Sequence, residues 1–240
     1  DALPISEKAK HRRAVLKSAL EVFGRRSQGG SLADFVELLE NLPDDVSEMR
    51  DATRIAADLA ENLKDATTND PLFAGSGTPV DPGVLLTPAE GKKARVPVIN
   101  LAGLTTEDQK QSFVNQLQMG LFAWIKKNPA GDRPLGGLFV MDEAQNYAPS
   151  DRYTAATHST LALASQARKY GLGLVFATQA PKGLHNRIAG NAATQFYGLL
   201  NSPAQIAAAQ EMARAKGGSV PDVGRLPAGQ FYAAVEGAEF

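Results

Sequence analysis

The chain has 240 residues, which is enough for one large hydrophobic core or two modest ones. Its apolar content of 43% and charged content of 21% are typical of a globular protein, and no apolar run is long enough to cross a membrane. The lack of cysteine excludes disulfides and Cys-ligated zinc, and the net charge of −1 argues against an extended basic face for nucleic acid.

The spacing of apolar residues predicts a helical segment over residues 1–70. Ser6 is a candidate helix cap, and Ser31 with Asp34 forms a capping pattern ahead of a second apolar stripe. The expected helices lie near residues 6–23, 31–39 and 47–66. Because the composition changes after residue 70, we predict a second domain over residues 71–240.

A turn-rich stretch follows, and it includes the glycine-rich run Phe73–Thr78. A phosphate-binding P-loop requires a Lys and a Ser or Thr after its last Gly, at the start of a helix. No Lys follows Gly77, and Pro79 and Pro82 exclude a helix there. The pattern occurs nowhere else in the chain, so we expect any such loop to lie upstream of Asp1. The missing initial Met is typical of a piece of a longer protein.

The α/β pattern begins with an apolar run at Val96–Leu101, which predicts a strand. Thr106 and Gln109 form a capping box for the helix that follows, and Pro129 ends it. Trp124 lies on the apolar stripe of this helix and is predicted to be a core residue.

The most informative stretch is Gly136–Asn146, in which four apolar residues are followed by Asp142 and Glu143. This pattern predicts a buried strand of a parallel sheet with two carboxylates at its carboxyl end, the edge at which open α/β sheets bind ligands. Such a pair suits phosphate hydrolysis, in which one carboxylate serves Mg²⁺ and the other activates a water. This arrangement is that of a Walker B element.

A second apolar run, Gly171–Ala177, ends close to Gln179. A segment of helical length joins the two runs, so they form a βαβ unit whose strand ends share one edge. Gln179 is then a candidate to contact a γ-phosphate or the attacking water. An ordinary turn-capping amide is the alternative for this residue.

The remaining chain predicts a short helix, a strand, a helix that starts at Ser202 and Pro203, and an edge strand. Polar loop residues beyond Gln179 are candidate DNA contacts, although an ordinary polar loop explains them equally well: Lys182, His185 and Arg187. No His has a second ligand at metal spacing, so we predict no transition-metal site. The predicted elements lie near residues 188–193, 196–200, 202–216 and 229–235.

Three segments together resemble the C-terminal half of HerA-like ATPases of the HerA/FtsK superfamily. They are Gly-Leu-Phe-Val-Met-Asp-Glu-Ala-Gln-Asn at 137–146, the run Ser165–Pro181, and the run Asn191–Pro203, and the resemblance covers about residues 71–236. It implies a three-layer RecA-like core of P-loop NTPase type, which is incomplete here because the Walker A region is missing. The expected cofactors are ATP and Mg²⁺.

The resemblance also implies a homo-hexameric motor that moves DNA, with a nuclease as a further candidate partner. The lack of cysteine fits a cytoplasmic protein, and the lack of a long apolar run predicts no membrane segment. Asp142 would bind Mg²⁺, Glu143 would activate water and Gln179 would sense the γ-phosphate. We expect residues 1–240 alone neither to hydrolyse ATP nor to hold it tightly.

Arg168 and Lys169 end the helix between the two strands. A basic pair at this position stabilises the helix macrodipole, which is sufficient to explain it. The resemblance implies a second role, in which Arg168, and less strongly Lys169, contacts the nucleotide of the neighbouring subunit.

Two alternatives remain at this point. A coupling ATPase of conjugation or secretion would share every site residue named above and would need a membrane partner. A scaffold protein with a vestigial acid pair would show no nucleotide effect when Glu143 is changed to Gln.

Overall fold

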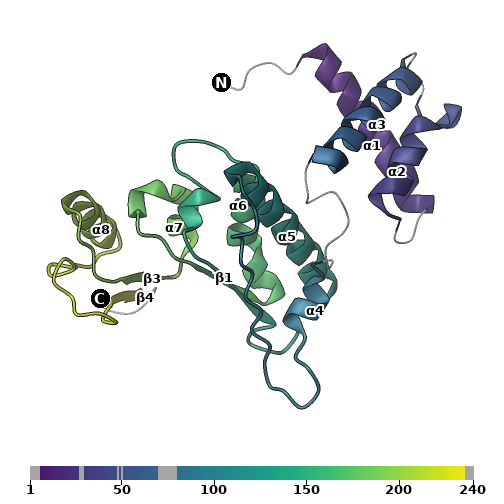
Figure 1. Ribbon diagram of the computed structural model, residues 1–240. Helices are drawn as coiled ribbons and strands as arrows, with labels where there is room; N and C mark the ends of the chain where they lie inside the picture. Colours follow the sequence, from purple (N-terminus) through teal and green to yellow (C-terminus); the bar gives the residue numbers. More distant parts are fainter. Residues whose placement is uncertain (1–5, 27–29, 48, 50, 70–79, 236–240) are drawn as a thin grey trace. The chain divides into compact units, whose positions relative to one another are not determined.

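The structure is a computed structural model that describes residues 6–26, 30–47, 49, 51–69 and 80–235 (Figure 1). The chain divides into two compact units, residues 1–78 and 79–240. The glycine-rich run Phe73–Thr78 lies outside the described residues.

The first unit consists of helices packed around a core of their own (Figure 1). Ser31 and Asp34 form the predicted capping box, in which each side chain accepts a backbone N–H of the other residue. The first helix continues past Gly24, and the third starts later than predicted. The elements are α1 (Glu7–Arg26), α2 (Leu32–Glu40), the 3-10 turn η1 (Asp44–Val46) and α3 (Ala52–Asn69).

The second unit contains the predicted βαβ arrangement. Strands β1 (Gly137–Met141) and β2 (Leu172–Phe176) pair in parallel, with Gly137 opposite Leu172 and Met141 opposite Phe176. Between them lie the 3-10 turn η2 (Ala144–Asn146), helix α6 (Thr157–Gln166) and the turn η3 (Ala167–Tyr170). The carboxyl ends of both strands therefore lie at one edge.

One face of this sheet is covered by α5 (Glu107–Lys127) and α6. Phe139 and Met141 point into the clusters formed with these helices. On the other face Leu138 and Val140 are 52% and 58% exposed. The prediction of a strand buried on both faces is wrong for β1, whose burial alternates, and the described residues form no third layer.

The predicted strand at Val96–Leu101 is also absent from the structure. Val96 and Val98 are 86% and 87% exposed, and residues 94–100 have no regular secondary structure. An apolar run becomes a strand only where a neighbouring strand pairs with it, and here Pro97 also lacks a backbone donor.

Pro82 was predicted to exclude a helix, but the short helix α4 (Pro82–Leu86) begins at this residue. The side chain of Asp81 accepts the N–H of Gly83 and caps the helix. Proline is tolerated here because the first residue of a helix needs no N–H donor. The exclusion was therefore wrong for Pro82.

The C-terminal part forms a separate antiparallel pair, β3 (Thr194–Tyr197) with β4 (Tyr232–Val235). Helix α8 (Pro203–Ala215) packs on it around Ala209, Ala213 and Val223 (Figure 1). The prediction of one mostly parallel sheet is wrong for this part, since β3 pairs with β4 alone among the described strands. The turn η4 (Pro181–Gly183) and helix α7 (Asn186–Asn191) connect the two sheets.

Candidate functional site

The candidate site lies where β1 and β2 end. Asp142 and Glu143 directly follow β1, and Gln179 follows β2 after two intervening residues. The Gln179 amide nitrogen donates to Glu143 Oε1 at 2.7 Å. The structure thus brings the predicted acid and the predicted amide into direct contact at the carboxyl edge of the sheet.

The backbone of Glu143 is left-handed, with φ 48° and ψ 43°. It is the one residue other than glycine with positive φ in the described part of the chain. Such a conformation costs of order 1 kcal/mol or more and persists only where the surroundings fix it. Ala144 N–H donates to Ala177 C=O at 3.0 Å, and Asn146 N–H donates to Glu143 C=O at 2.9 Å. These bonds hold the turn that presents the Glu143 carboxylate.

Asp142 is exposed, and its Oδ1 accepts the backbone N–H of Glu143 at 2.9 Å. A single accessible carboxylate fits Mg²⁺, which keeps several waters and often binds through one or two carboxylates plus substrate phosphates. Within the described ranges no three His, Cys, Asp or Glu side chains cluster to hold a metal ion. The described residues therefore form no complete protein cage for a metal ion.

Two further residues complete the polar cluster, and the sequence reasoning missed both. The Gln145 amide nitrogen donates to Glu143 Oε2, and its Oε1 accepts the Thr178 hydroxyl at 2.6 Å. Thr178 Oγ1 in turn accepts Ala180 N–H at 3.0 Å. Each oxygen of Glu143 is thus bound by one amide. Gln145 and Thr178 could have been found from the sequence only by their position, because each lies within two residues of a predicted site residue.

Backbone hydrogen bonds tie the loop after β1 to the loop after β2. Ser150 N–H donates to Gly183 C=O at 2.9 Å, and His185 N–H donates to Ala148 C=O at 2.8 Å. The Ser150 hydroxyl also donates to the Lys182 carbonyl at 2.7 Å. These three bonds therefore join the acid-bearing loop to the amide-bearing loop.

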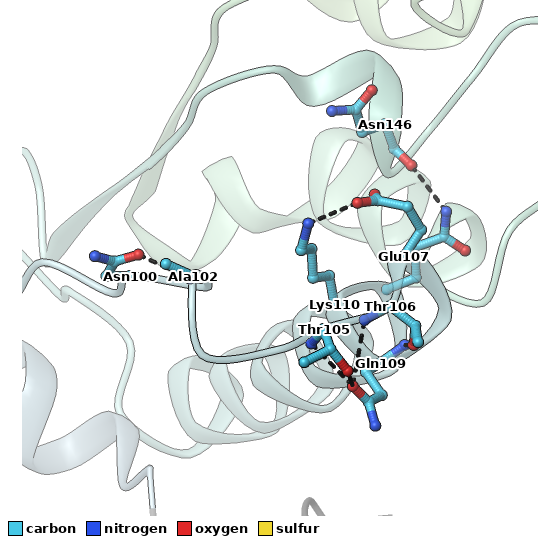
Figure 2. A network of polar contacts seen from close by, with 9 residues as sticks. Asn100, Ala102, Thr105, Thr106, Glu107, Gln109, Lys110 and Asn146 are labelled. Atoms are coloured by element: carbon cyan, nitrogen blue, oxygen red, sulfur yellow. Dashed lines mark hydrogen bonds and ion pairs between the residues drawn. The ribbon is translucent and has the colours of Figure 1, made fainter.

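The start of α5 also contacts the loop after β1, at Asn146 (Figure 2). The Gln111 amide nitrogen donates to Asn146 C=O at 3.2 Å. Lys110 Nζ lies 2.6 Å from Glu107 Oε1, and this contact raises the pKa of Lys110. Burial, with a smaller contribution from Glu107, raises the pKa of the Tyr147 hydroxyl.

Arg168 and Lys169 do not join this cluster. Both lie in η3, which precedes β2, so they are at the opposite edge of the sheet from Glu143. Both are exposed, and Lys169 Nζ lies 5.2 Å from the centre of the Tyr170 ring. Within one chain the two cations therefore lie apart from Glu143 and Gln179.

No family model and no curated protein matches the chain. Among solved structures it is similar to the genome packaging NTPase B204 from Sulfolobus turreted icosahedral virus 2. The complex of that protein with sulfate matches with a TM-score of 0.39 and 18% identity, over 51% of this chain and 55% of that chain. The complex with AMPPCP matches with a TM-score of 0.37 and 17% identity, over 52% and 64%. The match thus spans little more than half of that chain, and it assigns neither a family nor an activity.

The described part of the chain contains several helices of 18 residues or more. None of them is both long enough and apolar enough to cross a bilayer.

Proposed function

We propose that this chain is part of an ATP-hydrolysing motor of the P-loop NTPase class. The observation that carries the proposal is the contact between Glu143 and Gln179 beside the exposed Asp142, at the carboxyl edge of a parallel strand pair. Open α/β sheets bind ligands at this edge. The sequence resemblance to HerA-like ATPases points to the same chemistry and to the same three residues.

The proposed roles follow from what each side chain can do at this edge. Asp142 contributes a carboxylate to Mg²⁺, which would neutralise charge on the phosphates. Glu143 accepts a proton from the attacking water. Gln179 turns its amide toward the terminal phosphate or that water.

Both Glu143 oxygens are bound by amides, so the described arrangement is a resting state. Each oxygen keeps a second lone pair, so Glu143 can accept a proton with both amides bound, but an amide must leave Glu143 before it can turn toward a phosphate or water. Gln179 is the one to leave, because it is exposed and has no second partner among its described hydrogen bonds. Gln145 is held at its other end by Thr178 and stays in place.

Two further parts of the proposal come from the resemblance alone. The first is that the natural protein forms a homo-hexameric ring that moves DNA. The second is that Arg168, with Lys169 beside it, completes the nucleotide site of the neighbouring subunit. The position of both residues at the far edge of the sheet is compatible with that role.

The test is the change Glu143→Gln in the natural full-length protein. Removal of a general base should lower ATP turnover by about 10²-fold or more, while nucleotide binding persists. Glu37→Gln, which alters an exposed carboxylate on α2 in the first unit, is the control and should leave turnover unchanged. Equal turnover in the Glu143 variant and the wild type would show that Glu143 is not the base, and a lack of turnover in both proteins would favour a scaffold with a vestigial acid pair.

A further inference from the structure

Three aromatic side chains meet on the surface of the second unit. The Tyr153 ring is 61% exposed and lies between two imidazoles. Its centre is 5.1 Å from that of His158, with the planes tilted by 36°, and 6.0 Å from that of His185, edge to face. Two of the three histidines of the chain thus flank one open tyrosine ring.

The backbone around this ring cluster is fixed. Tyr153 lies in the loop after β1, His158 in the first turn of α6, and His185 directly before α7. A bridge pairs Pro149 with Leu184, and His185 N–H donates to Ala148 C=O at 2.8 Å. The Thr154 hydroxyl donates to Tyr147 C=O at 2.9 Å. The exposed ring therefore does not result from a loosely held loop.

Each of the two loops carries a cation close in sequence to a ring residue. Arg152 precedes Tyr153, Arg187 follows His185 by two residues, and both are exposed. Lys182 is also close in sequence, but its Nζ pairs with Glu211 at 2.8 Å. Asp151 is the one acidic neighbour in the loop of Tyr153. The surface thus combines an open aromatic face with a small excess of positive charge.

We infer that this surface binds a single-stranded nucleic acid, with a base stacked on Tyr153 and phosphates near Arg152 and Arg187. Proteins that bind single strands combine stacking rings with cations that follow the backbone, and every base offers a face for stacking. Two imidazoles beside the ring extend the stacking surface. A duplex keeps its bases stacked inside and offers no face to Tyr153.

The inference rests on the nucleic-acid part of the proposed function, and it places that contact on the two loops that carry Glu143 and Gln179. Their backbone bonds give a physical route between the surface and the site. Binding of a strand does not require hydrolysis, so the two proposals are tested separately. If Glu143→Gln left ATP turnover unchanged, the proposed role of Glu143 in hydrolysis would be contradicted, but the prediction of strand binding at Tyr153 would still stand.

The test is fluorescence anisotropy of a labelled oligothymidylate titrated with residues 1–240, without nucleotide. Tyr153→Ala should weaken binding by about five- to tenfold, because stacking of one base is lost. Tyr153→Phe keeps the ring and should bind as the wild type does. The matched control is Phe231→Ala, since Phe231 is equally exposed at 61% but contacts no imidazole in the described structure.

Two further measurements separate stacking from charge and from misfolding. Tyr153→Trp should bind at least as tightly as the wild type, and the fluorescence of the introduced indole should fall when the strand stacks on it. Arg187→Gln should reduce the slope of log K against log salt by about 0.7, the value for one phosphate contact on a single strand.

The inference would be overturned if the Tyr153→Ala variant bound the oligonucleotide as tightly as the wild type, or if Tyr153→Phe and Tyr153→Ala lost the same affinity. Tighter binding of a duplex of matched length would also overturn it. The absence of any binding to the oligonucleotide would do so as well, and would point to a protein partner for this surface. Circular dichroism of each variant checks that the fold is intact.

Discussion

The Thr178 hydroxyl donates to Gln145 Oε1 at 2.6 Å, and this bond fixes which end of the Gln145 amide faces Glu143. The amide nitrogen is left to donate to Glu143 Oε2. One neutral side chain therefore joins the loop after β1 to the loop after β2 and holds the carboxylate proposed as the base. Gln145 is a positioning residue in this arrangement, since it acts through Glu143.

The first prediction concerns this bridge. Gln145→Ala removes a hydrogen bond to a charged group and leaves the half-buried Thr178 hydroxyl without its acceptor. We expect a loss of about 1–3 kcal/mol in the free energy of unfolding. Urea denaturation of residues 1–240 measures it. The control is Gln116→Ala on the exposed face of α5, which should stay within about 0.5 kcal/mol of the wild type. Equal effects of the two changes would show that the bridge contributes nothing to stability.

The second prediction compares two leucines on opposite faces of the parallel pair. Leu138 is 52% exposed and Leu172 only 2%. The same truncation to Ala should therefore cost about 2–5 kcal/mol at Leu172, where a cavity forms, and less than about 1 kcal/mol at Leu138. Chemical denaturation of both variants measures the difference. Equal costs would mean that the face carrying Leu138 is covered in solution.

That uncovered face explains why part of the fold was beyond sequence reasoning. The apolar run before Asp142 predicts a strand correctly, and the parallel pairing with the run before Thr178 follows from the helix between them. Apolar character alone does not tell whether both faces are covered, since that depends on elements elsewhere in the chain. Val96 and Val98 show the same limit, because their run has strand composition but pairs with no described strand.

The candidate site was predictable to a similar extent. Asp142, Glu143 and Gln179 lie where strand ends place them, so the rule for parallel sheets was enough to bring them together. Gln145 and Thr178 were missed because their importance comes from side-chain geometry across two loops. The left-handed backbone of Glu143 was equally invisible, since Glu has no preference for that conformation.

The third prediction concerns acid pH and the capping box of α2. Hydrogen bonds from the backbone and side chain of Ser31 lower the pKa of Asp34 from its ordinary value of 3.8. A lowered pKa in the folded state means that the carboxylate stabilises the fold above about pH 4, and that this contribution is lost as the pH falls through the folded pKa. Asp34→Ala should therefore lower Tm at pH 7, and the difference from the wild type should shrink at lower pH.

Thermal unfolding followed by circular dichroism measures this change across the pH range. The control is Glu61→Ala, which removes a carboxylate in the interior of α3, away from any helix N-terminus. A Tm difference for Asp34→Ala that stays constant from pH 7 to about pH 2 would contradict the proposed cause.

The last prediction concerns Arg168, which lies at the opposite edge of the sheet from Glu143. Because it cannot reach the site of its own chain, its proposed role requires a second copy. In the natural full-length protein, Arg168→Ala should lower ATP turnover by about 10³-fold while nucleotide binding persists. Lys169→Ala should have a smaller effect, since an ammonium lacks the planar fork that binds phosphate oxygens in pairs.

Mixing the variants distinguishes action between chains from action within one chain. Glu143→Gln copies keep Arg168, and Arg168→Ala copies keep Glu143. A mixed interface is therefore intact where the Arg168→Ala copy supplies the site and the Glu143→Gln copy supplies the arginine, and it lacks both groups in the reverse order. Turnover should therefore reappear when the two inactive proteins are combined and allowed to exchange subunits, and should reach a maximum near equal amounts. If Arg168 acted within its own chain, or only stabilised the end of the helix that precedes it, every mixture would stay as inactive as its components.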